Sequence, residues 1–215
     1  MKNLLYKEMR LALHPTNILF IPLAMMLFIP NYPYLVVMFY TCLGIFFMCQ
    51  FGRENNDVFF TLTLPVEKRR AVLARITTAC MLEIGEIIAC VPIALIKVKL
   101  TTARNYADMD VNIALFALAF MMFGLFNIVF FPGYYKNVKK VGKPFVFGSV
   151  AVFAFIGVEI TLCYAAPFFK NRLDTPDPQY IAEKLVLLAV GIAAFFLLTL
   201  AAYKLSAKRF ERQDI

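Results

Sequence analysis

The chain has 215 residues, of which 61% are hydrophobic and 17% are charged, and its mean hydropathy is +0.72. A soluble domain of this size would contain roughly 45–50% apolar and about 25% charged residues, so this composition excludes an ordinary soluble domain. The formal net charge of +8 fits the excess of basic residues that membrane proteins carry in their cytoplasmic loops, and no nucleic-acid partner is expected.

The first stretch, residues 1–14, predicts an amphipathic helix that lies in the membrane interface. Polar residues recur at helical spacing at Asn3, Lys7 and Arg10, and apolar residues face elsewhere. Such a helix buries its apolar face at the boundary of headgroups and acyl chains, with its bases among the headgroups. Pro15 ends the helix. We therefore expect Lys7 and Arg10 to be membrane-interface anchors.

Six apolar stretches follow, and they predict an all-α membrane protein with a single transmembrane domain over residues 1–215. The expected spans are about residues 16–30, 35–51, 71–96, 112–131, 144–167 and 185–203. The first is the weakest, because it is short and contains Pro22. At ~1.5 Å per residue it crosses only with help from its flanks or with local thinning of the bilayer.

The distribution of basic residues predicts that both termini lie in the cytoplasm. With six spans in this orientation, 16 of the 22 Lys and Arg residues lie on the inner side, as the positive-inside rule requires. If the first stretch did not cross, the later loops would change sides and the bias would reverse. The charge pattern therefore supports six spans more strongly than the hydropathy of the first stretch does.

The first long polar interruption, Gly52–Arg75, separates the second and third spans. In order, it holds an acidic and amide patch, an apolar run, a Leu-Pro pair and a basic cluster: Glu54, Asn55, Asn56, Asp57; Val58, Phe59, Phe60, Leu62; Leu64, Pro65; Lys68, Arg69, Arg70. Amide and acidic side chains cap helix N-termini, and proline ends helices. We predict a short cytoplasmic helix with an apolar docking face, which calls for a partner, and a basic anchor in the headgroups.

Three glutamates, Glu83, Glu86 and Glu159, lie well inside the expected spans. A carboxylate at this depth is costly unless it faces a cavity, water or a partner. Glu83 and Glu86 are three residues apart and share a helix face. The three side chains can line a translocation path or bind a proton or cation, or they can serve helix packing, and the sequence leaves both readings open.

Motifs for chemistry on this chain are absent from the sequence. It contains no P-loop, no HExxH, no GxSxG and no dinucleotide-binding fingerprint. Its five cysteines stand in or near apolar spans without metal-ligand spacing. We expect no catalytic residue, no metal site and no cofactor on the chain itself.

The interfacial first helix, the six spans and the composition of the first cytoplasmic loop together resemble an ABC-2 type exporter permease. The likeness is greatest to the small permeases of phenol-soluble-modulin and lantibiotic-immunity exporters. Its motif is the acidic and amide patch followed by Thr63-Leu64-Pro65-Val66-Glu67-Lys68-Arg69. Glu67 stands where a small hydroxyl residue is usual in those permeases, so the match is close but incomplete.

The resemblance implies that residues 1–14 form an elbow helix and that Glu54–Pro65 hold a coupling helix. This helix would contact a separate ABC ATPase subunit, which would bind ATP and Mg²⁺. The resemblance also implies a permease homodimer with two ATPase copies in the plasma membrane of a bacterial cell. Its cargo would be an amphipathic or hydrophobic substrate, such as a membrane-active or antimicrobial peptide.

Two other classes of function remain open at this point. An ion- or proton-coupled carrier would use the three glutamates, although the sequence shows no internal inverted repeat of the kind common in carriers. A membrane-embedded enzyme would need a nucleophile or a set of metal ligands, and the sequence offers neither.

Overall fold

The structure is a computed structural model that describes residues 2–12, 16–101 and 105–213. Its elements are α1 (Lys2–Lys7), the π-helix η1 (Glu8–Ala12), α2 (Thr16–Phe20), the 3-10 helix η2 (Ile21–Phe28), α3 (Tyr34–Glu54), α4 (Asp57–Thr63), α5 (Lys68–Leu100), α6 (Ile113–Tyr134), α7 (Gly142–Ala165), the π-helix η3 (Phe169–Leu173) and α8 (Ile181–Glu211). These residues contain no strand, which confirms the all-α class.

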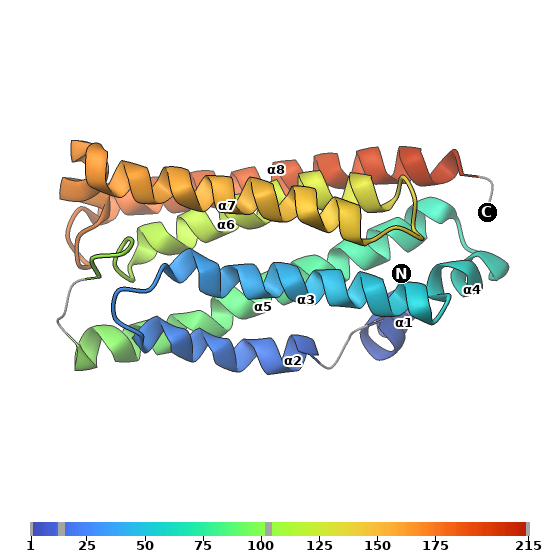
Figure 1. Cartoon of the computed structure of the whole chain (residues 1–215), viewed down its shortest axis with the longest axis horizontal. Helices are drawn as coiled ribbons and strands as arrows, with labels where there is room; N and C mark the ends of the chain where they lie inside the picture. The colour runs from blue at the N-terminus through green and yellow to red at the C-terminus, as the bar shows by residue number, and fades with distance from the viewer. Residues whose placement is uncertain (1, 13–15, 102–104, 214–215) are drawn as a thin grey trace.

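The long helices α3, α5, α6, α7 and α8 run side by side along the longest axis of the molecule, in alternating directions (Figure 1). Within the described ranges, these five are long and apolar enough to cross a membrane. They correspond to the second to sixth predicted spans. Helices α5 and α8 extend beyond the predicted spans 71–96 and 185–203 at both ends, because hydropathy marks the apolar part of a helix and not its charged ends.

The first predicted span, residues 16–30, is shorter than the other five. It consists of α2 and η2 and ends at Phe28. Pro22, at the start of η2, cannot donate an i→i−4 hydrogen bond, and the chain there winds as a 3-10 helix. At ~1.5 Å per α residue and ~2.0 Å per 3-10 residue the two pieces extend about 24 Å, less than the ~30 Å hydrocarbon core. The crossing of the membrane by residues 16–30, and with it the count of six spans, stays a prediction.

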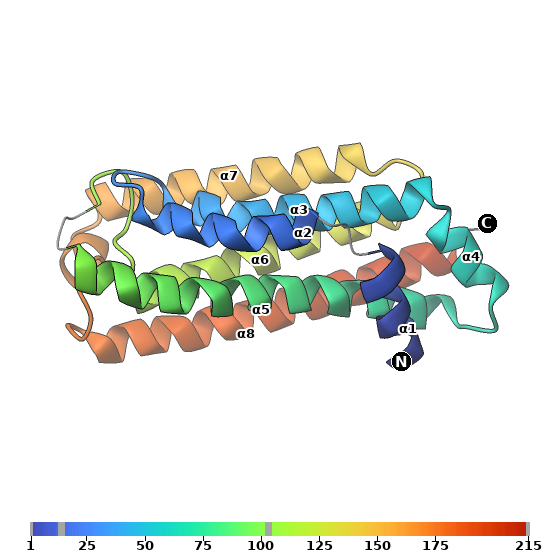
Figure 2. The same ribbon diagram turned by 90° about the horizontal axis from the view of Figure 1, so that it is seen from below.

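Helices α1 and η1 lie across the bundle near one of its ends (Figure 2). They cover the described part of the predicted interfacial helix, and residues 1, 13 and 14 of that helix lie outside the described residues. Helix α4 and the C-terminal end of α8 lie at the same end of the bundle (Figures 1 and 2). Because α1 and the C-terminal end of α8 lie at the same end of the bundle, the chain runs along the bundle an even number of times between them, as the prediction of six spans requires.

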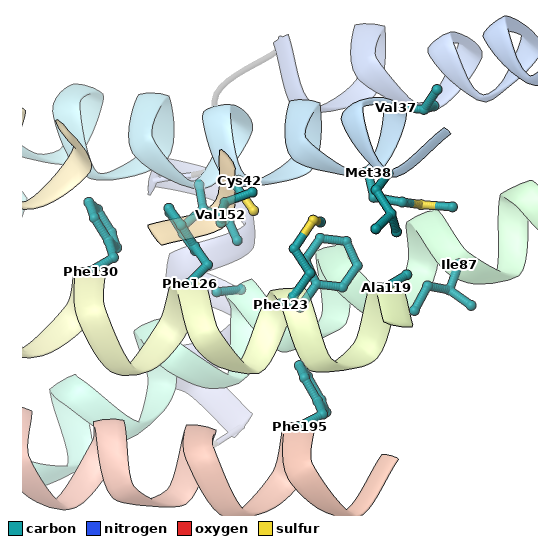
Figure 3. Packing of buried hydrophobic residues seen from close by; sticks show 14 of the residues in the cluster. Val37, Met38, Cys42, Ile87, Ala119, Phe123, Phe126, Phe130, Val152 and Phe195 are labelled. Carbon is teal, nitrogen blue, oxygen red and sulfur yellow. The ribbon is translucent and has the colours of Figure 1, made fainter. Parts of the chain in front are cut away.

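Helix α6 forms the centre of the core. It is apolar all round, which is the pattern of a helix buried on every side, and it packs against α3, α7 and α8. Figure 3 shows Phe126 and Phe130 of α6 directed towards α3, and Phe195 of α8 beside α6. The rings of Phe126 and Phe130 stack with their centroids 5.0 Å apart.

The backbones of α6 and α8 approach closely at two glycines. A Cβ atom on Gly191 would lie 2.4 Å from the carbonyl oxygen of Ala117, and one on Gly124 would lie 3.0 Å from Cα of Phe195. Small residues allow this approach between membrane helices, where packing rather than exclusion of water drives association. The contact positions α8 against α6, and therefore against the polar groups that both helices carry.

Candidate functional site

Helix α4 turns the chain from α3 into α5. Asn56, which occupies the N-cap position, has φ 50° and ψ 29°, a left-handed conformation that asparagine adopts more readily than most residues. Its side chain makes no capping hydrogen bond, so the cap lies where the sequence predicts but does not work as predicted. The helix ends at Thr63, because Leu64 is extended and Pro65 cannot continue a helix.

Beneath α4 lies a group of buried charges that we call the ionic cluster: Lys7 of α1, Glu8 of η1, Asp57 of α4 and Arg75 of α5. Glu8, Asp57 and Arg75 are almost completely buried, and the Lys7 side chain is 11% exposed. The cluster joins residues that are far apart in the chain, since Glu8 and Arg75 are separated by 67 positions.

Arg75 holds both carboxylates of the ionic cluster. Its guanidinium donates two hydrogen bonds to Glu8, with Nη2 3.2 Å from Oε1, and Nη2 also donates to Asp57. Lys7 Nζ lies 2.7 Å from Asp57 Oδ1 and 2.9 Å from Glu8 Oε1. The same Nζ lies 2.6 Å from Thr61 Oγ1 on the next turn of α4. Helix α1 with η1, helix α4 and the start of α5 are therefore connected through charge-assisted hydrogen bonds.

Two bases balance two acids in the ionic cluster, so its formal net charge is zero. Removing one member of a buried pair leaves an uncompensated charge, at a cost of about 3–5 kcal/mol. Gly52 of α3 makes room for the guanidinium, because a Cβ atom there would lie 3.0 Å from Arg75 Nη1. The ionic cluster therefore holds three segments together: α1 with η1, α4 and the start of α5.

The inner face of α4 packs against the bundle. Asp57 and Thr61 are buried and belong to the surroundings of the ionic cluster, and Val58 and Leu62 pack against the hydrophobic core. Phe59 is half-buried, and its ring centroid lies 5.4 Å from Lys139 Nζ in the loop between α6 and α7. The structure thus places part of the predicted docking run inside the protein.

The outer face of α4 is open. Phe60 is 55% exposed and Leu64 is 37% exposed, although both are large apolar residues. Four more of the sequence-predicted contact residues are exposed: Glu54, Asn55, Asn56 and Pro65. These six of the sequence-predicted contact residues are therefore accessible to a partner.

The predicted anchors Lys7 and Arg10 have protein partners. Lys7 belongs to the ionic cluster, and Arg10 Nη1 donates to the Tyr6 hydroxyl at 2.5 Å. Arg10 is exposed, so of the two it is the side chain that can reach headgroups.

The predicted basic anchor at the start of α5 connects this helix to the end of α8. Lys68 Nζ donates to the Gln213 carbonyl oxygen at 2.6 Å. Arg69 makes a two-fold contact with the Glu211 carboxylate, with Nη2 3.0 Å from Oε2. Arg70 pairs with Glu67 on its own helix. Arg69 and Arg70 remain exposed, so these pairs lie at the surface.

In the middle of the bundle, Glu83 belongs to a buried polar contact between three helices. Asn127 Nδ2 of α6 lies 3.0 Å from Glu83 Oε2 of α5 and 3.1 Å from Thr199 Oγ1 of α8. Glu83 and Asn127 are fully buried. Contacts of this kind hold membrane helices together, so the geometry favours a packing role for Glu83.

The other two glutamates have different neighbours. Glu86 accepts a long hydrogen bond from the Cys90 thiol, 3.7 Å away on the same helix. Glu159 lies near the C-terminal end of α7 and accepts from the Cys163 thiol at 3.1 Å. Asp108, in the loop before α6, also lies beside Glu159 and Cys163. Glu83 and Glu159 thus belong to separate polar groups.

A cavity of about 600 Å³ opens between α5, α6 and α8 in their halves away from α4. Most of its lining is apolar, as at Leu95, Phe116 and Leu188, and its polar members come largely from the helix ends and loops: Lys97, Asp110, Asn112 and Asp177. An apolar chamber with a polar end suits an amphipathic molecule.

Sequence reasoning missed Glu8 and Arg75 as members of a site. A signal existed for Arg75, because it lies inside the predicted span 71–96 and an arginine in a span requires a partner. No local signal identifies Glu8 as a site residue, since apart from the neighbouring Lys7 its partner is Arg75 of α5, 67 positions away.

Comparison with known proteins gives one match to a family. The family model described as ABC-2 family transporter protein matches residues 3–211. Neither a search of curated proteins nor a search of solved structures finds a match.

Proposed function

The chain belongs to the ABC-2 transporter family, and from that premise we propose that it is the permease subunit of an ATP-driven exporter. As a family member it is a multi-pass membrane component of an ABC transporter, which works with an ABC ATPase. We propose that this ATPase is a separate polypeptide, present in two copies beside a permease homodimer, and that ATP and Mg²⁺ bind there.

The observation that carries this proposal is the ionic cluster beneath α4. The outer face of α4 exposes Phe60 and Leu64, while its inner face is tied through Asp57 to Arg75 of α5 and to Lys7 of α1. A partner that binds the outer face and moves would displace α4. Because α4 is bound to α5 and to the elbow region, these segments would move with it.

The orientation of the bundle supports the same proposal. An ATPase is cytoplasmic, so the end that carries α1, α4 and the end of α8 would face the cytoplasm. The loop between α6 and α7, which is rich in lysine, approaches α4 through the contact of Lys139 with Phe59. Positively charged loops stay on the cytoplasmic side.

The cavity between α5, α6 and α8 supports an amphipathic cargo. Its apolar lining would take hydrocarbon or apolar side chains, and its polar end would take a charged or hydrogen-bonding group. A membrane-active peptide has this character, and we propose that class as the substrate. The three glutamates do not line one path, as the carrier alternative would require, since Glu83 and Glu159 belong to separate polar groups.

Transport by the reconstituted complex tests the proposal. Vesicles containing the permease and its ATPase are loaded with ATP and Mg²⁺ on the ATPase side, and movement of a labelled amphipathic peptide is followed. We expect transport that requires ATP and is lost in the double variant Phe60→Ala, Leu64→Ala. This variant leaves Asp57 intact, so the ionic cluster is preserved. Transport driven by a pH gradient without ATP would overturn the proposal.

A further inference from the structure

At the end of the bundle opposite α4, the loop before α6 folds against the last turns of α7. The Tyr164 hydroxyl of α7 donates to the Tyr106 carbonyl oxygen of this loop. Two positions further along the loop, Asp108 is buried, with 4% of its surface exposed. The loop thus places the Asp108 carboxylate in a buried position with little access to water.

Asp108 meets two further ligand-type side chains there. One ligand atom each from Asp108, Glu159 and Cys163 lies within 4.8 Å of the other two, and all three residues are buried. Glu159 and Cys163 are four residues apart on α7 and therefore share a face, with Cys163 Sγ 3.1 Å from Glu159 Oε1. The carboxylates of Asp108 and Glu159 and the thiol of Cys163 therefore lie close together.

Each of the two carboxylates keeps one oxygen without a protein donor. Asp108 Oδ1 accepts from the Met109 amide at 2.7 Å, while Asp108 Oδ2 and Glu159 Oε2 are buried and have no hydrogen-bond partner within the described ranges. An unpaired buried carboxylate is costly. Two of them side by side require either a cation or a shared proton.

We propose that Asp108, Glu159 and Cys163 bind a divalent cation of the zinc class. Zinc takes thiolate sulfur at ≈ 2.3 Å and carboxylate oxygen at ≈ 2.0–2.2 Å, which places tetrahedral ligand atoms about 3.3–3.6 Å apart. The ligand atoms, which lie within 4.8 Å of one another, reach these separations with small side-chain movements. The sulfur ligand favours zinc over calcium and magnesium, which prefer oxygen alone. Three protein ligands leave a fourth position for water.

Such a site would fix the loop before α6 to α7. Asp110 and Asn112, which belong to the polar lining of the cavity, follow Asp108 closely in the same segment. A bound cation would therefore hold part of the cavity lining in place. The inference does not depend on the ATPase or on the direction of transport, so the two proposals can fail separately.

Metal binding by the purified full-length chain in detergent tests the site. The chain is equilibrated with Zn²⁺, freed of unbound metal, and its zinc content is measured. We expect a stoichiometric amount of zinc in the native chain and a loss of at least tenfold in affinity for Cys163→Ser, Asp108→Asn and Glu159→Gln. The matched controls are Cys80→Ser, another span cysteine, and Glu183→Gln, an acid at the same end of the bundle, and both should bind zinc as the native chain does.

A second measurement does not use the site variants, so it remains decisive if they fail to fold. Co²⁺ bound through a thiolate gives a sulfur-to-metal charge-transfer absorption, which we expect for the native chain and for Cys80→Ser. Absence of this absorption in the native chain overturns the proposal and leaves a proton shared between Asp108 and Glu159. Zinc binding that is unchanged in folded Cys163→Ser overturns it as well.

Discussion

Arg75 of α5 donates a hydrogen bond to Asp57 of α4, and both side chains are buried. Through this pair the short helix between α3 and α5 is fixed to α5. The pair fixes α4 to the bundle, and substitution of Arg75 tests its contribution to stability.

Replacing Arg75 with Met should destabilise the protein by about 3–5 kcal/mol, because Glu8 and Asp57 lose one of the two bases that they share and the buried cluster keeps an uncompensated negative charge. Chemical denaturation in detergent measures the change in the free energy of unfolding. The control is Arg70→Ala, since the exposed Arg70–Glu67 pair should contribute about 0–1 kcal/mol. Equal losses for the two variants would show that the ionic cluster does not stabilise the fold.

Replacing Phe60 with Asp should abolish binding of the ATPase while leaving the permease folded, because the substitution places a charge in an apolar docking surface. Copurification of the tagged permease with its ATPase measures binding. Phe168→Asp is the matched control, since Phe168 is comparably exposed (50% against 55%) but lies near the opposite end of the bundle. ATPase binding retained by Phe60→Asp would argue against α4 as the contact.

Replacing Glu83 with Gln should leave transport largely unchanged if this residue serves helix packing. The amide has the same shape and can still bond to Asn127, whereas Asn127→Leu removes both donors and should cost about 1–3 kcal/mol. Vesicle transport and thermal unfolding measure the two effects. Thr161→Ala, on the exposed part of α7, is the control for stability. Abolished transport in a folded Glu83→Gln variant would instead support a role in the path.

Replacing Gly191 with Ala should destabilise the contact between α6 and α8. The new Cβ would lie 2.4 Å from the Ala117 carbonyl oxygen, so the helices must separate, at a cost of about 1–3 kcal/mol or more. Gly157→Ala is the control, because a Cβ there meets no atom within 4 Å and alanine favours helix by about 0.8–1.0 kcal/mol. Thermal unfolding should therefore give opposite signs, and shifts in the same direction would contradict the packing argument.

The positions of the helices could be predicted from the sequence because long apolar runs are a local signal. The end of α4 before Pro65 could be predicted for the same reason, since proline acts on its immediate neighbours. The exact ends of the helices could not be predicted as well, as the charged extension of α8 to Glu211 shows. The 3-10 winding of η2 could not be predicted either, because Pro22 shows that one helical hydrogen bond is missing but not how the chain winds afterwards.

Most of the polar groups could not be predicted, because their members meet only in the folded chain. The ionic cluster joins Glu8 to Arg75 across 67 positions, and Asn127 meets Thr199 across 72. Asp108 comes from a loop whose contacts include Asn31, Tyr32 and Tyr164 of α7, all far away in the sequence. Sequence spacing alone therefore gave no reason to expect a metal site, whereas the structure brings together a candidate set of ligands.

The separation of Glu8 from Arg75 in the sequence also has a consequence for synthesis. The chain is made from its N-terminus at ~5–20 residues per second, so Arg75 follows Glu8 by roughly 3–13 s. During that interval the acid and the neighbouring Lys7 have neither Asp57 nor Arg75 to bind. Helix α1 is made first, yet it can take up its final contacts only after α3, α4 and the start of α5 have left the ribosome.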